Sequence, residues 1–188
     1  MRNRLFVAVA ISAVLTACGQ PDPAERNDTI ASANAPAELV AAAEKANVVL
    51  GPAVSGEQAM TLMEDRHEGM EDIGDAFKII GRETKAVSPD VAAIREAAAV
   101  IADGADKSSS WFPPGTGPDV GKTRAKAEIW QKPEDFAAKD KAFREAALAF
   151  KAAADSGDVN AIKAQAGELA KACKSCHDPY RKPESEHD

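Results

Sequence analysis

Strand-like alternation of apolar and polar residues is missing from this 188-residue sequence, and aromatic residues make up only 5% of it. The chain has one tyrosine, two tryptophans and three cysteines. The missing alternation argues against a β-sandwich or barrel, and three cysteines are too few for a small scaffold held by several disulfides. Because large side chains are scarce, alanine fills many of the positions that would face other helices.

Basic residues are also in the minority, with 23 Lys and Arg against 30 Asp and Glu and a formal net charge of −7. Removing residues 1–17 as a leader would take away Arg2 and Arg4, leaving 21 basic residues and a charge of −9. Such an acidic chain is a poor candidate for neutralising phosphates, so we expect no nucleic-acid partner. Charge would not draw it to an anionic membrane surface either.

The first 17 residues are organised like an export signal. Arg2 and Arg4 precede an apolar run, residues 5–15, which is too short to span a bilayer as a helix. The Leu-Thr-Ala that leads into Cys18 resembles a bacterial lipobox, in which cleavage precedes the cysteine and the thiol is lipidated. An ordinary secretory signal followed by a chance cysteine is the alternative. We expect export to the periplasmic side of a bacterial envelope, with a lipid anchor at Cys18 as the membrane contact.

The rest of the chain changes in composition along its length. Residues 18–54 are expected to form the lipidated cysteine and a flexible tether, because their first half is polar and rich in proline. For residues 37–50, an extension that packs on the folded domain is the alternative. Residues 55–182 carry helical periodicity, and residues 183–188 are expected to be an acidic tail.

Helical periodicity begins after Ser55 and predicts four amphipathic helices. In the first helix, residues that share one face recur at every third or fourth position from Met63 to Ile80. All of these residues are apolar except Arg66. Ser55 and Gln58 are predicted to form a capping box at its start. A charge on a core-facing stripe requires a partner, so Arg66 stands out.

Local start and stop signals predict the other helix boundaries. Ser88 as cap with Pro89 in the first turn begins the second helix, and the third spans about 133–154. The Ser-Gly-Asp run at 156–158 ends the third helix and caps the fourth, whose apolar face extends over 159–180. The predicted fold is therefore all-α, an antiparallel four-helix bundle. Its alanine-rich seams leave room for a large planar apolar group.

The sequence Cys173-Lys-Ser-Cys176-His177 is compatible with four kinds of site. A thioredoxin-type pair would follow a strand, and a zinc site would require further ligands where the chain offers His67 and His187. A local disulfide would leave the histidine without a role. C-x-x-C-H is the attachment signal of c-type haem, in which two thiols form thioethers and the histidine binds iron. We predict one covalent haem c in the core of the bundle.

With this motif the chain resembles the class II c-type cytochromes, which include cytochrome c′ and its low-spin relatives. The resemblance covers about residues 57–182 and depends on four motifs in the family's order. These are RHEGM at 66–70, WFPPGTG at 111–117, TRAKAEIW at 123–130 and CKSCHDPYR at 173–181. Members are four-helix bundles with haem attached near the C-terminus. The lipobox and tether depart from the soluble members.

The resemblance implies roles for individual residues. Cys173 and Cys176 would be the haem thioethers and His177 the proximal axial ligand, while Met70 would take the distal axial position. Arg66 would lie near a haem propionate, although a snorkelling side chain is the alternative. Arg181 would lie beside the proximal face. The resemblance also implies a homodimer formed through the first two helices.

Two functions remain open for such a protein. As an electron carrier it would exchange electrons with redox partner proteins of the envelope, and the Met70 thioether, as sixth ligand, would raise the potential. As a five-coordinate cytochrome c′ it would bind nitric oxide or carbon monoxide in an apolar pocket that Met70 only occludes. A membrane tether favours the carrier, which is the prediction. No acid–base constellation accompanies the motif, so we expect no enzyme.

Overall fold

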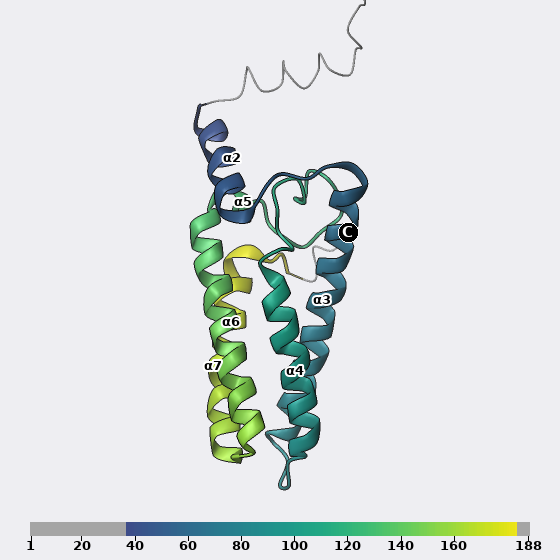
Figure 1. Ribbon diagram of the computed structural model, residues 1–188, viewed down its shortest axis with the longest axis vertical. Coiled ribbons are helices and arrows are strands. Elements are labelled where there is room, and N and C mark those ends of the chain that lie inside the picture. Colours follow the sequence, from purple (N-terminus) through teal and green to yellow (C-terminus); the bar gives the residue numbers. More distant parts are fainter. Residues whose placement is uncertain (1–36, 184–188) are drawn as a thin grey trace, which may run out of the picture. The chain divides into compact units, whose positions relative to one another are not determined.

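The computed structural model describes residues 37–183, which fold as a helical unit (Figure 1). The predicted leader, lipidated Cys18 and the acidic tail beyond residue 183 lie outside the described residues. The helices are α2 (Ala37–Leu50), α3 (Gly56–Glu83), α4 (Val91–Ser108), α5 (Glu128–Gln131), α6 (Pro133–Ser156) and α7 (Val159–Tyr180). None of the helices in this part of the chain combines the length and apolarity needed to cross a bilayer.

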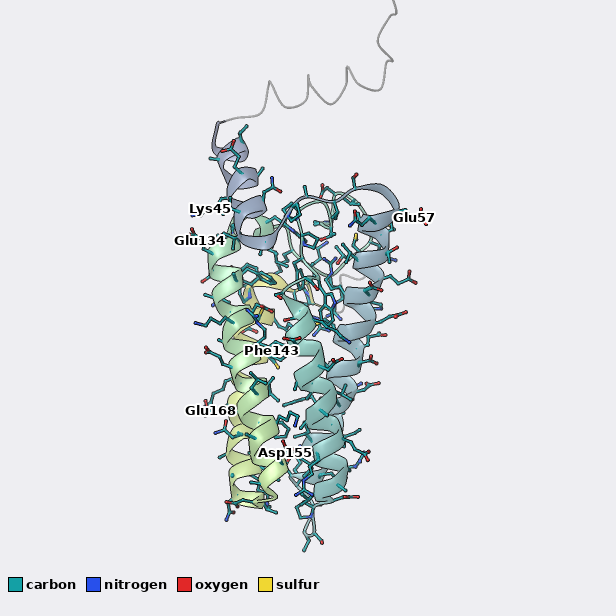
Figure 2. All side chains as sticks on the ribbon, in the orientation of Figure 1. Lys45, Glu57, Glu134, Phe143, Asp155 and Glu168 are labelled. Atoms are coloured by element: carbon teal, nitrogen blue, oxygen red, sulfur yellow. The ribbon has the colours of Figure 1, made fainter. Side chains whose placement is uncertain are left out.

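The four long helices pack in chain order, α3 on α4, α4 on α6 and α6 on α7 (Figure 1). Fully buried isoleucine, leucine and phenylalanine side chains fill the interior: Ile80, Ile94, Ile101, Phe150, Ile162 and Leu169. Figure 2 shows Phe143 of α6 directed into the space beside α4. This confirms the predicted all-α four-helix bundle. In contrast to the other neighbours, α3 and α7 do not form a close pair.

The second long helix begins two residues later than predicted. Its cap is Asp90, whose carboxylate accepts hydrogen bonds from the N–H groups two and three residues later, at 2.9 and 3.1 Å. Ser88 and Pro89 therefore belong to the turn, and the predicted start at these residues is wrong. The Asp90 carboxylate satisfies two of the four N–H groups that are free at the start of the helix.

At the other helix ends, the predicted signals at residues 157 and 158 are confirmed and the predicted capping box at Ser55 is not. Gly157, with φ of 75°, ends α6 in the left-handed conformation that glycine adopts without strain. Asp158 then caps α7 by accepting a hydrogen bond from Asn160 N at 2.9 Å, as predicted. At the start of α3, the side chain of Ser55 makes no cap hydrogen bond, so the predicted capping box is not formed.

Residues 37–50, for which two alternatives stood open, form helix α2 and pack against α5 and α6. Ala46 is only 1% exposed in this contact. Lys45 pairs with Glu134 of α6 at 2.7 Å, and Figure 2 shows the two residues side by side. The packed extension therefore describes this segment. The bounds of the leader, tether and tail stay predictions.

Arg66 attaches the long connection between α4 and α5 to helix α3. It is 4% exposed, and its guanidinium donates to the carbonyl of Trp111 and the hydroxyl of Thr116, at 3.3 and 3.2 Å. It also donates to the carbonyl of Thr116 and the hydroxyl of Thr123, both at 3.0 Å. The ring of Phe112 lies 5.0 Å from the guanidinium carbon. Burial lowers the pKa of Arg66 to about 10, so it remains charged at neutral pH.

Gly69 allows the indole of Trp111 to lie close to α3, and Gly104 allows α4 to lie close to Ile73 of α3. A Cβ added to Gly69 of α3 would collide with the Trp111 ring, and one added to Gly104 of α4 would meet Ile73 at 2.7 Å. Any larger residue at these positions would push the ring or the neighbouring helix away. The connection is therefore held on α3 both by Arg66 and by the packing of its first aromatic ring.

Gly69→Ala should lower the free energy of unfolding of the haem-loaded protein by about 1–3 kcal/mol, because the new methyl overpacks the Trp111 site. Gly167→Ala in the exposed part of α7, where an added Cβ meets nothing within 4 Å, should raise it by up to about 1 kcal/mol, as expected from helix propensity alone. Denaturant unfolding of both variants measures the difference. Equal effects of the same sign would contradict the tight Trp111 contact.

Candidate functional site

The Cys-x-x-Cys-His motif lies in the last turns of α7. Cys173 and Cys176 are three positions apart, which places both thiols on one face of the helix. Both cysteines are half-buried and packed against the hydrophobic core. α7 remains helical as far as Tyr180, so the helix itself positions the two sulfurs and His177.

The thiols are held in their neutral form. Burial raises the pKa of Cys173, and it raises the pKa of Cys176 to about 11. A thioredoxin-type pair depends on a lowered thiol pKa, so this environment does not support that alternative. Among residues 37–183, no three His, Cys, Asp or Glu side chains converge as metal ligands, and the zinc alternative also lacks support.

The surroundings of His177 favour the neutral form of its imidazole. It is half-buried, and burial lowers its pKa, with the positive charges of Arg181 and Arg124 acting in the same direction. The neighbouring Asp178 opposes the shift. Iron binds the neutral imidazole, so burial and the two arginines favour the ligating form at neutral pH.

An antiparallel bridge fixes the end of α7 to the segment that precedes α5. Lys126 N donates to the carbonyl of Tyr180 at 2.9 Å, and Lys182 N donates to the carbonyl of Arg124 at 2.8 Å. The guanidinium of Arg124 donates two further bonds to the carbonyl of Lys182, at 3.0 and 3.2 Å. The carboxyl end of α7 is thereby attached to the same connection that Arg66 holds.

These contacts place Met70 and His177 at the same level of the bundle. Arg66 of α3 binds residue 123 of the connection, and Arg181 follows α7 at the bridge to residue 125. Met70 lies one helical turn after Arg66 along α3, and His177 lies one helical turn before Arg181 along α7. Both are therefore displaced from the connection toward the middle of the bundle. Met70 is half-buried and packs against the core. Since α3 and α7 are not a close pair, these residues fit a planar apolar group between the two helices.

A row of aromatic rings supports this end of the bundle. Phe136 of α6 meets Phe112 with ring centroids 4.7 Å apart, and it meets Tyr180 of α7 at 5.3 Å, both in edge-to-face geometry. The Tyr180 hydroxyl donates to Asp135 at 2.5 Å, and burial together with this bond raises the pKa of Tyr180. Tyr180 therefore closes the core one turn from His177.

A buried carboxylate near the motif was not singled out from the sequence. Asp140 of α6 is 6% exposed, accepts a hydrogen bond from Ser108 at 2.5 Å and lies 3.1 Å from the Arg144 guanidinium. Burial raises the pKa of Asp140, whereas Ser108 and Arg144 oppose the shift. Burial is the main cause of the raised pKa of Cys176, and the negative charge of Asp140 acts in the same direction. The signal was a charge on the apolar stripe of α6, the same signal that identified Arg66.

The other residues predicted for the site lie as follows. Arg181 is exposed and shares a shallow pocket with His177. The guanidinium of Arg66 donates its hydrogen bonds to the connection between α4 and α5, and its approach to a haem propionate stays a prediction. Met63 is buried in the core, whereas Met60 is 52% exposed and is not part of it. His67 lies on the surface, and its imidazole is 3.5 Å from the carboxylate of Glu71.

Comparison with known proteins agrees with this geometry. A sequence model of the family "Cytochrome C'" matches residues 61–181, the stretch from α3 to the end of α7. The cytochrome c′ of Alcaligenes xylosoxydans xylosoxydans is 39% identical over 66 residues, which are 35% of this chain and 52% of that protein. The chain thus spans about half the length of such curated relatives.

Solved structures extend the likeness over the whole bundle. A cytochrome c′ with an unusual ligand-controlled dimer dissociation has a TM-score of 0.62 and 32% identity, covering 68% of this chain and 99% of its own. A nitric oxide complex of a cytochrome c prime variant from Alcaligenes xylosoxidans has a TM-score of 0.61 and 28% identity, covering 67% and 97%. The predicted resemblance and the predicted haem c are confirmed.

Replacing both Cys173 and Cys176 by serine should abolish covalent haem attachment and leave the bundle poorly ordered. The alanine-rich seam between the helices cannot close tightly without its largest core group. Haem staining after denaturing electrophoresis and far-ultraviolet circular dichroism measure the two effects. Lys174→Ser, an exposed position inside the same motif, is the control and should retain covalent haem. A stable, fully helical, haem-free double variant in normal yield would contradict the role of haem in the core.

Proposed function

Because the chain belongs to the cytochrome c′ family and carries one covalently bound haem c, we propose that it is an electron carrier of the bacterial cell envelope. In this proposal His177 and Met70 are the two axial ligands of a low-spin iron, and Cys173 and Cys176 hold the haem. The haem supplies a one-electron redox couple when bound. The proposal is of a carrier and not of an enzyme.

The observation that carries the proposal is the shared level of Met70 and His177. One turn from Met70, Arg66 binds the connection, and one turn from His177 the bridge binds the same connection. Gly69, next to Met70, is covered by the Trp111 ring. The backbone next to Met70 and the backbone next to His177 are both held by these contacts. Ligands on such a backbone can keep their positions when iron changes oxidation state, and an electron carrier requires this.

Arg66 and Arg181 keep narrower roles in the proposal. Arg66 anchors the connection, and its position one turn from Met70 is compatible with a haem carboxylate nearby. Arg181 lies close enough to His177 to lower the pKa of that imidazole, which supports a place beside the proximal face. Both assignments rest on the proposed haem position.

Gas binding is the second candidate function. It is favoured by the nitric oxide complex of the similar cytochrome c prime variant from Alcaligenes xylosoxidans. In that case Met70 would occlude the distal side without binding iron. The similar structure with ligand-controlled dimer dissociation supports a homodimer for this chain under either function.

Met70→Ala should convert a low-spin protein to high spin, lower the potential and allow rapid carbon monoxide binding, because the thioether no longer occupies the sixth position. Its structural cost is about 2 kcal/mol, at the low end for core truncations, since Met70 is half-buried. Visible spectra of the oxidised and reduced protein and stopped-flow mixing with carbon monoxide measure these changes.

Two further variants sharpen this test. Met70→Leu keeps most of the side-chain volume and removes the sulfur, so it should give the same spectral change with a smaller loss of stability. Met63→Leu, on the same face of α3, should leave the spectrum unchanged. A wild-type protein that is already high-spin and binds carbon monoxide rapidly would replace electron transfer by gas binding.

Export and lipid anchoring complete the proposal. They are supported by the charged and apolar pattern of residues 1–17 and by the small residues before Cys18. We place the folded domain on the periplasmic side, attached to a membrane through Cys18.

Cys18→Ser should release the protein from membranes into the soluble fraction after cell breakage. Acyl chains on Cys18 anchor stably, and none of the helices in residues 37–183 could span a bilayer instead. Fractionation followed by detection of the haem gives the distribution. A wild-type protein found in the soluble fraction would show that the lipoprotein proposal is wrong.

A further inference from the structure

We propose that Arg124, Lys126, Arg181 and Lys182 form a basic rim at which this protein exchanges electrons. We propose further that the rim docks a partner protein whose surface is rich in carboxylates. The inference rests on the proposed electron-carrier function. It assigns a face and a partner chemistry that neither the motif nor the family match provides.

The rim is built from two segments that are distant in sequence. The bridge between Ala125 and Arg181 brings the segment 124–126 against the end of α7. The backbone of Arg124, Lys126 and Lys182 forms these bonds, which leaves the lysine side chains outside the bridge. The four basic residues line one shallow pocket together with His177, Asp178 and Pro183.

Among the described residues that line the pocket, positive charges outnumber negative ones. Asp178 is the carboxylate among the pocket's lining residues, and Lys174 already binds both of its oxygens at 2.6 and 2.8 Å. Within residues 37–183, Arg124, Lys126 and Lys182 form no ion pair, whereas many other lysines pair within their own helix. Examples of such pairs are Lys107–Asp103, Lys151–Asp155 and Lys171–Glu168. Like charges held together in this way favour an anionic partner.

The rest of the surface has the opposite character. The chain has a formal charge of −7, and α3 exposes a series of acidic side chains: Glu64, Asp65, Glu68, Glu71, Asp72 and Asp75. At physiological salt, charges interact over roughly 8 Å, so a docking protein responds to the local rim and not to the net charge. An extended anionic lipid surface would meet the acidic surface as well.

The rim is also the place where the site approaches solvent. His177, the proposed iron ligand, lines the same pocket as the four basic residues. Electron transfer slows steeply with distance, so a partner seated on the rim would have a short route through the imidazole. Electrostatic complementarity at such a face mainly raises the association rate.

Stopped-flow oxidation of the reduced, haem-loaded protein by ferricyanide tests the local charge. Although both reactants are negative overall, the rate constant should fall as ionic strength rises, because the anion reacts at the basic rim. Lys126→Glu with Lys182→Glu should lower the rate constant about tenfold at low salt. The matched control is Lys85→Glu with Lys163→Glu, which makes the same change in net charge at exposed positions away from the pocket. It should change the rate less than twofold.

A binding measurement removes the dependence on redox activity. Hexacyanochromate(III), which has the charge of ferricyanide but is not reduced, should broaden the amide signals of residues 124–126 and 181–182 in nuclear magnetic resonance spectra. A polyglutamate peptide should compete with it in the wild type and in the control, and not in the rim variant. This competition tests for a carboxylate-rich partner.

The outcomes separate the two proposals. Equal slowing by both double variants, or a wild-type rate that rises with salt, would overturn the docking face and leave the carrier function standing. Binding to phosphatidylglycerol vesicles through the rim, with no effect of polyglutamate, would overturn the protein partner. A high-spin wild type that binds carbon monoxide rapidly would overturn the carrier function itself.

Discussion

The buried guanidinium of Arg66 is the interaction on which the placing of the site depends. A charge at 4% exposure must have polar partners, and here they are two carbonyls and two hydroxyls of the connection between α4 and α5. Neutral partners stabilise the charge without cancelling it. The same connection continues into the bridge with Arg181, so the level of α7 relative to α3 is set by hydrogen bonds instead of by direct packing of the two helices.

Most of this arrangement could be predicted from local pattern, and the exceptions have physical causes. The apolar stripes, Gly157 with Asp158 and the haem motif act over a few residues, so sequence alone identifies them. Asp90 instead of Ser88 caps α4 because the choice between two good caps depends on which backbone is extended at the helix start. The small apolar face of α2 is sufficient only because α5 and α6 offer a complementary surface. That surface is not visible in residues 37–50.

Long-range contacts were the least accessible to sequence analysis. The bridge between Ala125 and Arg181 is formed by backbone groups, which every residue has. No side-chain pattern could therefore predict it. Asp140 did leave a signal, a charge on an apolar stripe, and its partners Ser108 and Arg144 explain how the core accepts it. Arg66 and Asp140 show the same rule with opposite charge. A buried ion marks a place where the fold has built a polar environment.

The two candidate functions differ in one contact, the one between the Met70 sulfur and the iron. The contacts around Met70 and His177 bear on whether that contact forms. The backbone of α3 just before Met70 is held in two ways. The Trp111 ring packs on Gly69, and Arg66 donates hydrogen bonds to the connection. On the other helix, the bridge does the same for His177. Rigid support on both sides restricts how far the helices can separate, and a thioether on a flexible side chain can adapt within that limit. Such support is the structural reason for proposing a sulfur that stays close to the iron over a pocket that must open to admit a ligand.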